Sequence, residues 1–181
     1  MNGNFKNYLS YGTVMIAPMI LMSLIIWIFN LGQNKSIGWI SILVFIITIF
    51  FVQKHFRDNV YDGFISYGKL YGKTLLMLLF GGVLMGIYTY IFYKWIAPEE
   101  LTKMLDMVKI QLYEQELPES QLKQAYEYNE KYIMIPGSMA FFSVITTVFQ
   151  GVIIALITGI FVKKKADSYT EIMKELKTEE E

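Results

Sequence analysis

Polar but uncharged side chains interrupt the apolar stretch at residues 139–162. Gln150 is the most polar of them, and Thr146 and Thr147 lie about one helical turn before it. A carboxamide in hydrocarbon needs a hydrogen-bonding partner, because an unpaired polar group is costly away from water. Packing with interhelical hydrogen bonds is the simplest interpretation. The alternative is a polar pathway through a helical bundle, which we expect to use Gln150, Thr146 and Thr147.

Glycines at helical spacing are a second feature with a physical consequence. Gly82 and Gly86 lie four residues apart, Gly81 widens the same flat face, and Gly151 lies in the last apolar stretch. Small residues at this spacing let another helix backbone approach closely within a membrane. We therefore expect Gly81, Gly82, Gly86 and Gly151 to take part in helix packing.

Basic residues lie in and beside the connection between the second and third apolar stretches. They are Lys54, Arg57, Lys69 and Lys73. Long basic side chains at a membrane edge extend toward lipid phosphates. We expect these four residues to contact lipid headgroups.

Other patterns that could do chemistry are incomplete. Gly72-Lys73-Thr74 is similar to the end of a phosphate-binding loop, but Tyr67 stands where that pattern needs its first glycine. His55 is the only histidine, and the absence of cysteine excludes thiolate metal sites and disulfides. The apolar stretches contain neither a nucleophile–base pair nor the ionisable groups of coupled transporters. We therefore predict no enzymatic activity, no catalytic residue, no cofactor and no metal.

Four stretches without acidic or basic side chains must position these residues. They lie near residues 14–31, 37–52, 74–92 and 139–162. The chain is 54% hydrophobic, its mean hydropathy is +0.39 and its formal net charge is zero. A helix of about twenty residues crosses the hydrocarbon core of a bilayer. These stretches are apolar on all sides, unlike the surface helices of a soluble bundle. We predict a single all-α domain, a four-helix transmembrane bundle with spans at about 10–31, 37–54, 70–96 and 136–162.

The polar segment between the third and fourth spans has its own helix signals. Pro98 and Pro118 are each followed by glutamate, which is typical of a helix start. We predict an extramembrane helical hairpin over about 98–132. Four spans place both termini on one side, and the lysine excess there, which includes residues 163–165, predicts cytoplasmic termini and a cytoplasmic tail at 163–181.

The stretch from residue 62 to residue 165 resembles a bacterial family of small membrane proteins known only as a domain of unknown function. The resemblance lies in the order of several short segments. The segments are GFISYGK at 63–69, YKWIAP at 93–98, PESQL at 118–122 and PG at 136–137, followed by a helix containing Gly151 and the triple lysine. The resemblance implies a four-helix protein of the inner membrane of a Gram-negative bacterium. It implies no catalytic or binding residues.

Three classes of function remain open. The first is a non-enzymatic membrane protein that packs against a second copy or another membrane protein, motivated by the glycine face and the exposed hairpin. The second is a small uncoupled permease or channel along the polar face of the fourth span. The third is a lipid-binding membrane protein. We expect membrane lipids as partners in every case, and no nucleic acid.

Overall fold

Helices make up most of the part of the chain that its computed structural model describes, which is residues 2–32, 34–114 and 118–164. Pairing between extended residues in this part is limited to one isolated bridge, Ile65 with Lys164. The predicted all-α fold is confirmed. The predicted tail from residue 165 onward lies outside the described residues. Contacts between Cα atoms divide the chain into a first unit, Met1–Gly81 with Val148–Glu181, and a second unit, Gly82–Thr147.

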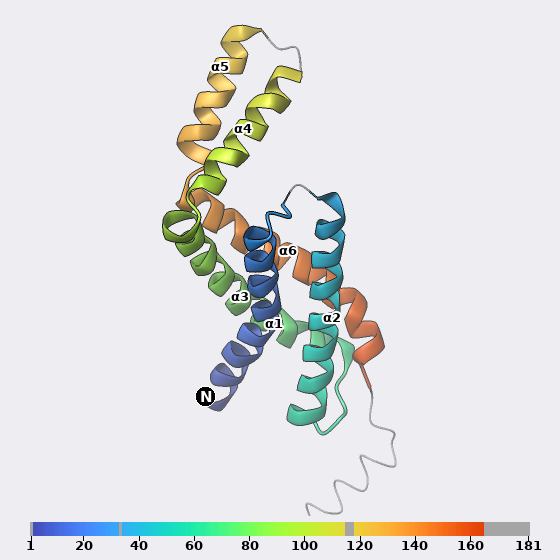
Figure 1. The fold of residues 1–181 in the computed structure, drawn as a ribbon. Coiled ribbons are helices and arrows are strands. Elements are labelled where there is room, and N and C mark those ends of the chain that lie inside the picture. The colour runs from blue at the N-terminus through green and yellow to red at the C-terminus, as the bar shows by residue number, and fades with distance from the viewer. Residues whose placement is uncertain (1, 33, 115–117, 165–181) are drawn as a thin grey trace, which may run out of the picture. The chain divides into compact units, whose positions relative to one another are not determined.

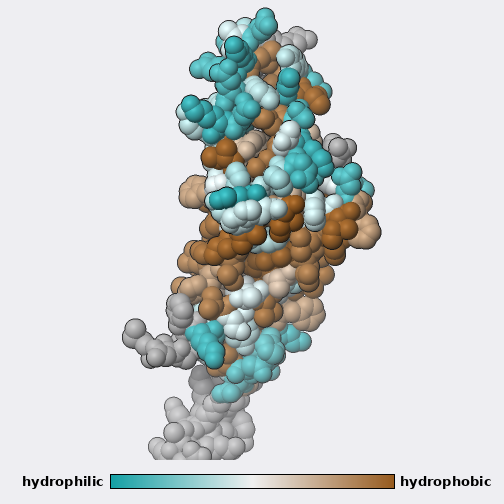
Figure 2. All heavy atoms as spheres, turned by 60° about the vertical axis from the view of Figure 1, so that its left-hand side comes forward, coloured by the Kyte–Doolittle hydropathy of each residue, from teal (hydrophilic) through white to brown (hydrophobic). Residues whose placement is uncertain are grey.

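Four long helices have the length and composition to cross a membrane. They are α1 (Asn2–Ile28), α2 (Lys35–Val60), α3 (Tyr67–Ile91) and α6 (Pro136–Val162), labelled in Figure 1. The π-helical turn η1 (Phe92–Ile96) continues α3. Large apolar side chains on these helices are exposed, among them Trp39 and Phe161 at 74% each. Figure 2 shows apolar side chains, in brown, over much of the surface that the long helices form. Such surfaces suit lipid rather than water.

The helices extend beyond three of the predicted spans. α1 begins at Asn2 rather than near residue 10, α2 continues to Val60, and α3 is helical from Tyr67. Charged and aromatic residues at a membrane edge leave the hydrocarbon, but they do not end a helix. α2 ends where Asp62 and Gly63 adopt positive φ angles of 50° and 85°. α6 has the bounds expected for the fourth span.

The core of the first unit lies where α1, α2, α3 and α6 meet. Asn34 caps α2 by accepting a hydrogen bond from the backbone N–H of Ser36 at 3.0 Å, which fixes the turn after α1. Large side chains that are almost fully enclosed fill the interior; they are Met15, Ile16, Phe45, Ile49, Phe56, Leu70, Met77 and Leu78. This apolar interior surrounds the polar cluster described below.

The second unit carries the two amphipathic helices of the expected hairpin. α4 (Glu99–Glu114) and α5 (Glu119–Tyr128) run side by side in Figure 1, and the π-helical turn η2 (Asn129–Ile133) follows. Figure 2 shows mostly hydrophilic side chains, in teal, over this part. Glu100 and Lys103 form an ion pair of 2.6 Å on α4. The hydrogen bond from Lys103 to Glu100 raises the pKa of the lysine.

Candidate functional site

A fully enclosed polar group of the first unit is the carboxamide of Gln53 on α2, which is 0% exposed. Its Nε2 donates to Oγ1 of Thr74 on α3 at 3.3 Å and to the carbonyl oxygen of Ala155 on α6 at 3.3 Å. Its Oε1 accepts a hydrogen bond of 2.8 Å from Oγ1 of Thr158 on α6. One side chain thus connects three candidate spans.

The two threonines of this cluster also bond within their own helices. Thr74 Oγ1 donates to the carbonyl of Leu70 at 2.9 Å, and Thr158 Oγ1 can donate to the carbonyl of Ile154 at 2.9 Å. In the part of the chain that the structure describes, no buried side-chain nitrogen or oxygen lacks a partner. The cluster of Gln53, Thr74 and Thr158 is therefore closed, and its chemistry is that of a cross-link between helices.

Gln53 was absent from the sequence candidates, although the sequence carried a signal for it. The uncharged stretch at 37–52 has too few residues to cross about 30 Å of hydrocarbon at 1.5 Å per residue. The helix had to continue past Val52, which brings Gln53 into the membrane. Which helices the amide would meet could not be read from the sequence, because the spans are apolar on all sides.

The polar candidates on α6 have different surroundings. Gln150 belongs to the first unit, is exposed, and forms no hydrogen bond through its amide with any described residue. Thr146 belongs to the second unit, and its hydroxyl donates to the carbonyl of Phe142 in its own helix at 2.7 Å. Thr147, also in the second unit, is half-buried. Gln150 is therefore the residue of this set that is exposed and has both a donor and an acceptor free for a hydrogen bond.

Gln150 lines an open hollow of about 450 Å³ on the first unit, which we call the Gln150 groove. Its lining comes from α1, α2 and α6 and consists of Met19, Gly38, Ser41, Ile42, Phe45, Gln150, Ile153 and Ile154. A Cβ atom added at Gly38 would meet nothing within 4 Å, so the groove is accessible on that side. Ser41 bonds to the carbonyl of Ile37 in its own helix at 3.0 Å. The groove is apolar apart from Gln150 and this hydroxyl.

Three of the four predicted packing glycines lie at contacts between helices of the same unit. A Cβ atom at Gly81 on α3 would lie 3.0 Å from the carbonyl oxygen of Gly12 on α1. One at Gly86 would lie 2.5 Å from Cγ2 of Val144 on α6, and one at Gly151 would overlap Leu78 on α3. Gly82 is buried. These glycines therefore permit close packing inside the chain rather than forming a free face.

Basic and aromatic side chains gather where the first turns of α1 and α3 meet the last turns of α2. Lys69 Nζ lies over the ring of Tyr61 at 4.5 Å, and Lys73 Nζ lies over the ring of Tyr8 at 5.2 Å. Phe56 lies between these rings, 6.3 Å from Tyr8 and 5.5 Å from Tyr61 between ring centroids. We call Tyr8, Phe56, Tyr61, Lys69 and Lys73 the aromatic platform.

The end of α6 reaches the same region of the first unit. Lys163 Nζ lies 5.9 Å from the ring centroid of Tyr67. Ile65 and Lys164 exchange backbone hydrogen bonds of 2.8 and 3.1 Å. Arg57 donates from Nη1 to the carbonyl oxygen of Val162 at 2.9 Å, which satisfies a terminal acceptor of α6. Lysines beyond the predicted set therefore contribute to this basic end.

The remaining predicted headgroup residues differ in how they are engaged. Arg57 is tied to Val162 and, through Nε, to a carboxylate oxygen of Asp58 at 2.7 Å. Lys54 is exposed. Of the four residues named from the sequence, the structure brings Lys69 and Lys73 together, and it uses Arg57 to hold the ends of α2 and α6.

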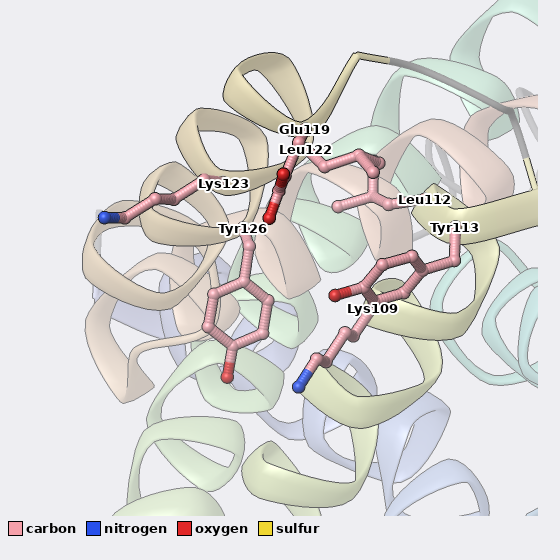
Figure 3. A pocket seen from close by; sticks show the side chains of 7 residues that line it. All are labelled: Lys109, Leu112, Tyr113, Glu119, Leu122, Lys123 and Tyr126. Atoms are coloured by element: carbon pink, nitrogen blue, oxygen red, sulfur yellow. The ribbon is translucent and has the colours of Figure 1, made fainter.

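The hairpin has a hollow of its own, of about 510 Å³, shown in Figure 3. Lys109, Leu112 and Tyr113 of α4 and Glu119, Leu122, Lys123 and Tyr126 of α5 line it. Lys109 Nζ lies 5.7 Å from the ring centroid of Tyr126, which links the two helices. The lining carries both signs of charge and both polar and apolar groups, so it does not select one class of ligand.

No group of three or more histidine, cysteine, aspartate or glutamate side chains among the described residues is arranged to hold a metal ion. The groups at the sites described above are amides, hydroxyls, ammonium groups, aromatic rings, the guanidinium of Arg57 and the carboxylates of Asp58 and Glu119. They can donate and accept hydrogen bonds and attract anions.

Four apolar helices, a closed polar cluster and a basic aromatic end define an all-α protein of the integral membrane class. A family model described as "Protein of unknown function (DUF4199)" matches residues 10–164, and the chain belongs to this family. The match includes most of α1 and all of α2, which precede the region from residue 62 that carries the resemblance. No curated protein and no solved structure matches the chain.

Proposed function

We propose that this integral membrane protein is a non-enzymatic interaction component of a bacterial inner membrane, and that it associates with a second copy of itself through the Gln150 groove. The observation that carries the proposal is Gln150, a carboxamide without a hydrogen-bonding partner among the described residues, near the middle of α6.

The position of Gln150 makes an unpaired amide costly. α6 runs from Pro136 to Val162, so Gln150 lies about 20 Å from either end at 1.5 Å per residue. Water is scarce at that depth, and an unpaired amide in an apolar medium costs about 2–7 kcal/mol. A partner that supplies a donor and an acceptor at this depth would remove most of that cost.

A second copy is the simplest molecule with the required chemistry. A carboxamide donates and accepts, so Gln150 side chains from two copies can bond to each other across a two-fold axis along the membrane normal. Lipid chains could fill the groove, but they carry no hydrogen-bonding group at mid-membrane depth. Gln150, Ile153 and Ile157 recur at helical spacing and are all exposed, so this face of α6 can also pack against its copy.

The test is association in lipid vesicles, measured by single-molecule photobleaching as the protein-to-lipid ratio is lowered. Gln150→Leu should weaken the dimer about fivefold, because an interhelical hydrogen bond of this kind contributes roughly 1 kcal/mol. Gly38→Leu should also weaken it by filling the groove. Gln124→Leu, the same change at an exposed position of α5, is the matched control and should have no effect.

Cross-linking gives an independent measurement, since the chain has no cysteine. A single cysteine at position 150 should form a disulfide between copies under mild oxidation, whereas Leu156→Cys, about 120° away around the axis of α6, should not. A wild-type protein that stays monomeric at every dilution, without a cross-link at position 150, would refute self-association. A protein recovered only with a different membrane protein would refute it as well.

We further propose that both termini lie in the cytoplasm. The first unit has Lys6, Lys54, Arg57, Lys69 and Lys73 at the end where α1 begins, and this excess supports a cytoplasmic assignment by the positive-inside rule. Single cysteines at positions 6 and 34 should react with an impermeant reagent from opposite sides of membrane vesicles. Labelling of both from the same side would contradict the topology.

A permease or channel has less support. The polar cluster of Gln53, Thr74 and Thr158 is buried and fully hydrogen-bonded, so it offers no open path for a solute. The hydroxyl of Thr146 already donates a hydrogen bond to a carbonyl of its own helix.

A further inference from the structure

We propose that the aromatic platform is a binding site for the phosphate of an anionic phospholipid headgroup, held between the ammonium groups of Lys69 and Lys73. This inference is independent of self-association, because it concerns a different surface of the first unit and a different class of ligand.

The spacing of the two lysines suits one phosphate group. Lys69 and Lys73 are four residues apart on α3, so their Cβ atoms lie about 5–6 Å from each other on one helix face. Two ammonium groups on such a face can donate to different oxygens of the same phosphate, in hydrogen bonds strengthened by charge.

The rings beneath the lysines hold the ammonium groups in place. Lys69 lies over Tyr61 and Lys73 over Tyr8, and Phe56 between those rings is 1% exposed. Tyr11 packs edge-on against Phe56 at 5.2 Å between centroids, which anchors the platform to α1. Ordering the lysines before binding reduces the entropy lost when a ligand arrives.

Charge at the platform favours an anion. Asp58 is engaged by Arg57 at 2.7 Å, so this carboxylate does not neutralise the two ammonium groups. A cation over an aromatic ring keeps its full charge. The N–H groups that do not face the ring remain free to donate, apart from the one through which Lys73 bonds to Tyr8. Lys69 is exposed and Lys73 is half-buried, so both remain accessible.

The depth of the platform indicates a lipid as the source of the phosphate. α3 and η1 together form a candidate span of 30 residues, Tyr67–Ile96, which is about 45 Å long at 1.5 Å per residue. The hydrocarbon core is about 30 Å thick, and the uncharged residues 74–93 between Lys73 and Lys94 are enough to cross it, so the first turns of α3 reach the headgroup layer. The half-buried ring of Tyr61 and the aliphatic stems of the two lysines can also contact the glycerol region of a lipid.

The experiment measures lipid retention by native mass spectrometry, with the full chain titrated with phosphatidylglycerol or phosphatidylcholine. Lys69→Gln should weaken phosphatidylglycerol binding about fivefold, and the double variant Lys69→Gln/Lys73→Gln about thirtyfold. The double variant Lys69→Arg/Lys73→Arg keeps both charges and should retain binding, which separates loss of the site from loss of the fold. Lys109→Gln/Lys123→Gln removes the same charge from the hairpin and should leave binding unchanged.

Each other outcome would overturn the proposal. Equal loss in the hairpin variant would show attraction by overall charge. Equal retention of phosphatidylcholine and phosphatidylglycerol would show that the lysines do not bind the anionic headgroup selectively. Competition by free glycerol phosphate at the same concentration as the lipid would assign the site to a soluble phosphate.

Discussion

Replacing Gln53 by methionine should destabilise the bundle by about 1–2 kcal/mol. Methionine has nearly the same length and volume, so the variant removes the hydrogen bonds of the amide without opening a cavity. Gln53 is fully enclosed and connects α2 to α3 and α6, so its loss acts on the packing of three helices at once.

The magnitude follows from the three hydrogen bonds that Gln53 makes. An interhelical hydrogen bond in a membrane protein contributes about 0.6 kcal/mol on average, and up to about 1.7 kcal/mol. The bond from Thr158 is short, at 2.8 Å, whereas the bonds to Thr74 and Ala155 are 3.3 Å long and correspondingly weaker. The two hydroxyls keep carbonyl partners in their own helices, so the variant leaves neither hydroxyl unsatisfied.

The assay is equilibrium unfolding in mixed micelles, followed by circular dichroism as the fraction of denaturing detergent rises. Thr48→Val is the control on the same helix, because the Thr48 hydroxyl bonds only to the carbonyl of Val44, at 2.8 Å, and should contribute little to tertiary stability. A double-mutant cycle between Gln53→Met and Thr158→Val isolates the pair. Unchanged stability of Gln53→Met, or strictly additive effects in the cycle, would refute the cross-link.

Two glycines should respond to the same substitution with opposite signs, measured by the same unfolding assay. Gly12→Ala should lower the free energy of unfolding by about 1–3 kcal/mol. The added Cβ would lie 2.6 Å from the carbonyl oxygen of Met77 and must push α1 away from α3. Gly72→Ala on α3 should stabilise the protein by about 0.5–1 kcal/mol, because its Cβ would meet nothing within 4 Å while helix propensity improves.

The helices themselves were largely predictable from the sequence. Uncharged stretches identify membrane spans because a charge in hydrocarbon is expensive, and this criterion depends on composition alone. The ends of the helices were harder to predict from the sequence, because the helices continue into the headgroup region, where charge is tolerated. α2 extends to Val60, and its last turns carry Phe56 and Arg57, which organise the basic end of the first unit.

The partners of individual side chains were not predictable in the same way. Gly81 and Gly86 look like members of one packing face in the sequence, yet Gly81 meets α1 and Gly86 meets α6. Tyr8 and Tyr61 lie far apart in the sequence, and the structure makes them the support for Lys73 and Lys69. Spans that are apolar on every side carry no pattern that tells which face meets which neighbour.

The two glutamines inside the four candidate spans differ in how their amides are hydrogen-bonded. Gln53 and Gln150 have the same side chain, but Gln53 is fully hydrogen-bonded within the chain while Gln150 has no such partner among the described residues. Removing the amide should therefore lower folding stability at position 53 without affecting association, and lower association at position 150 without affecting the stability of the monomer. If both variants changed the same quantity, the assignment of separate roles to the two amides would fail.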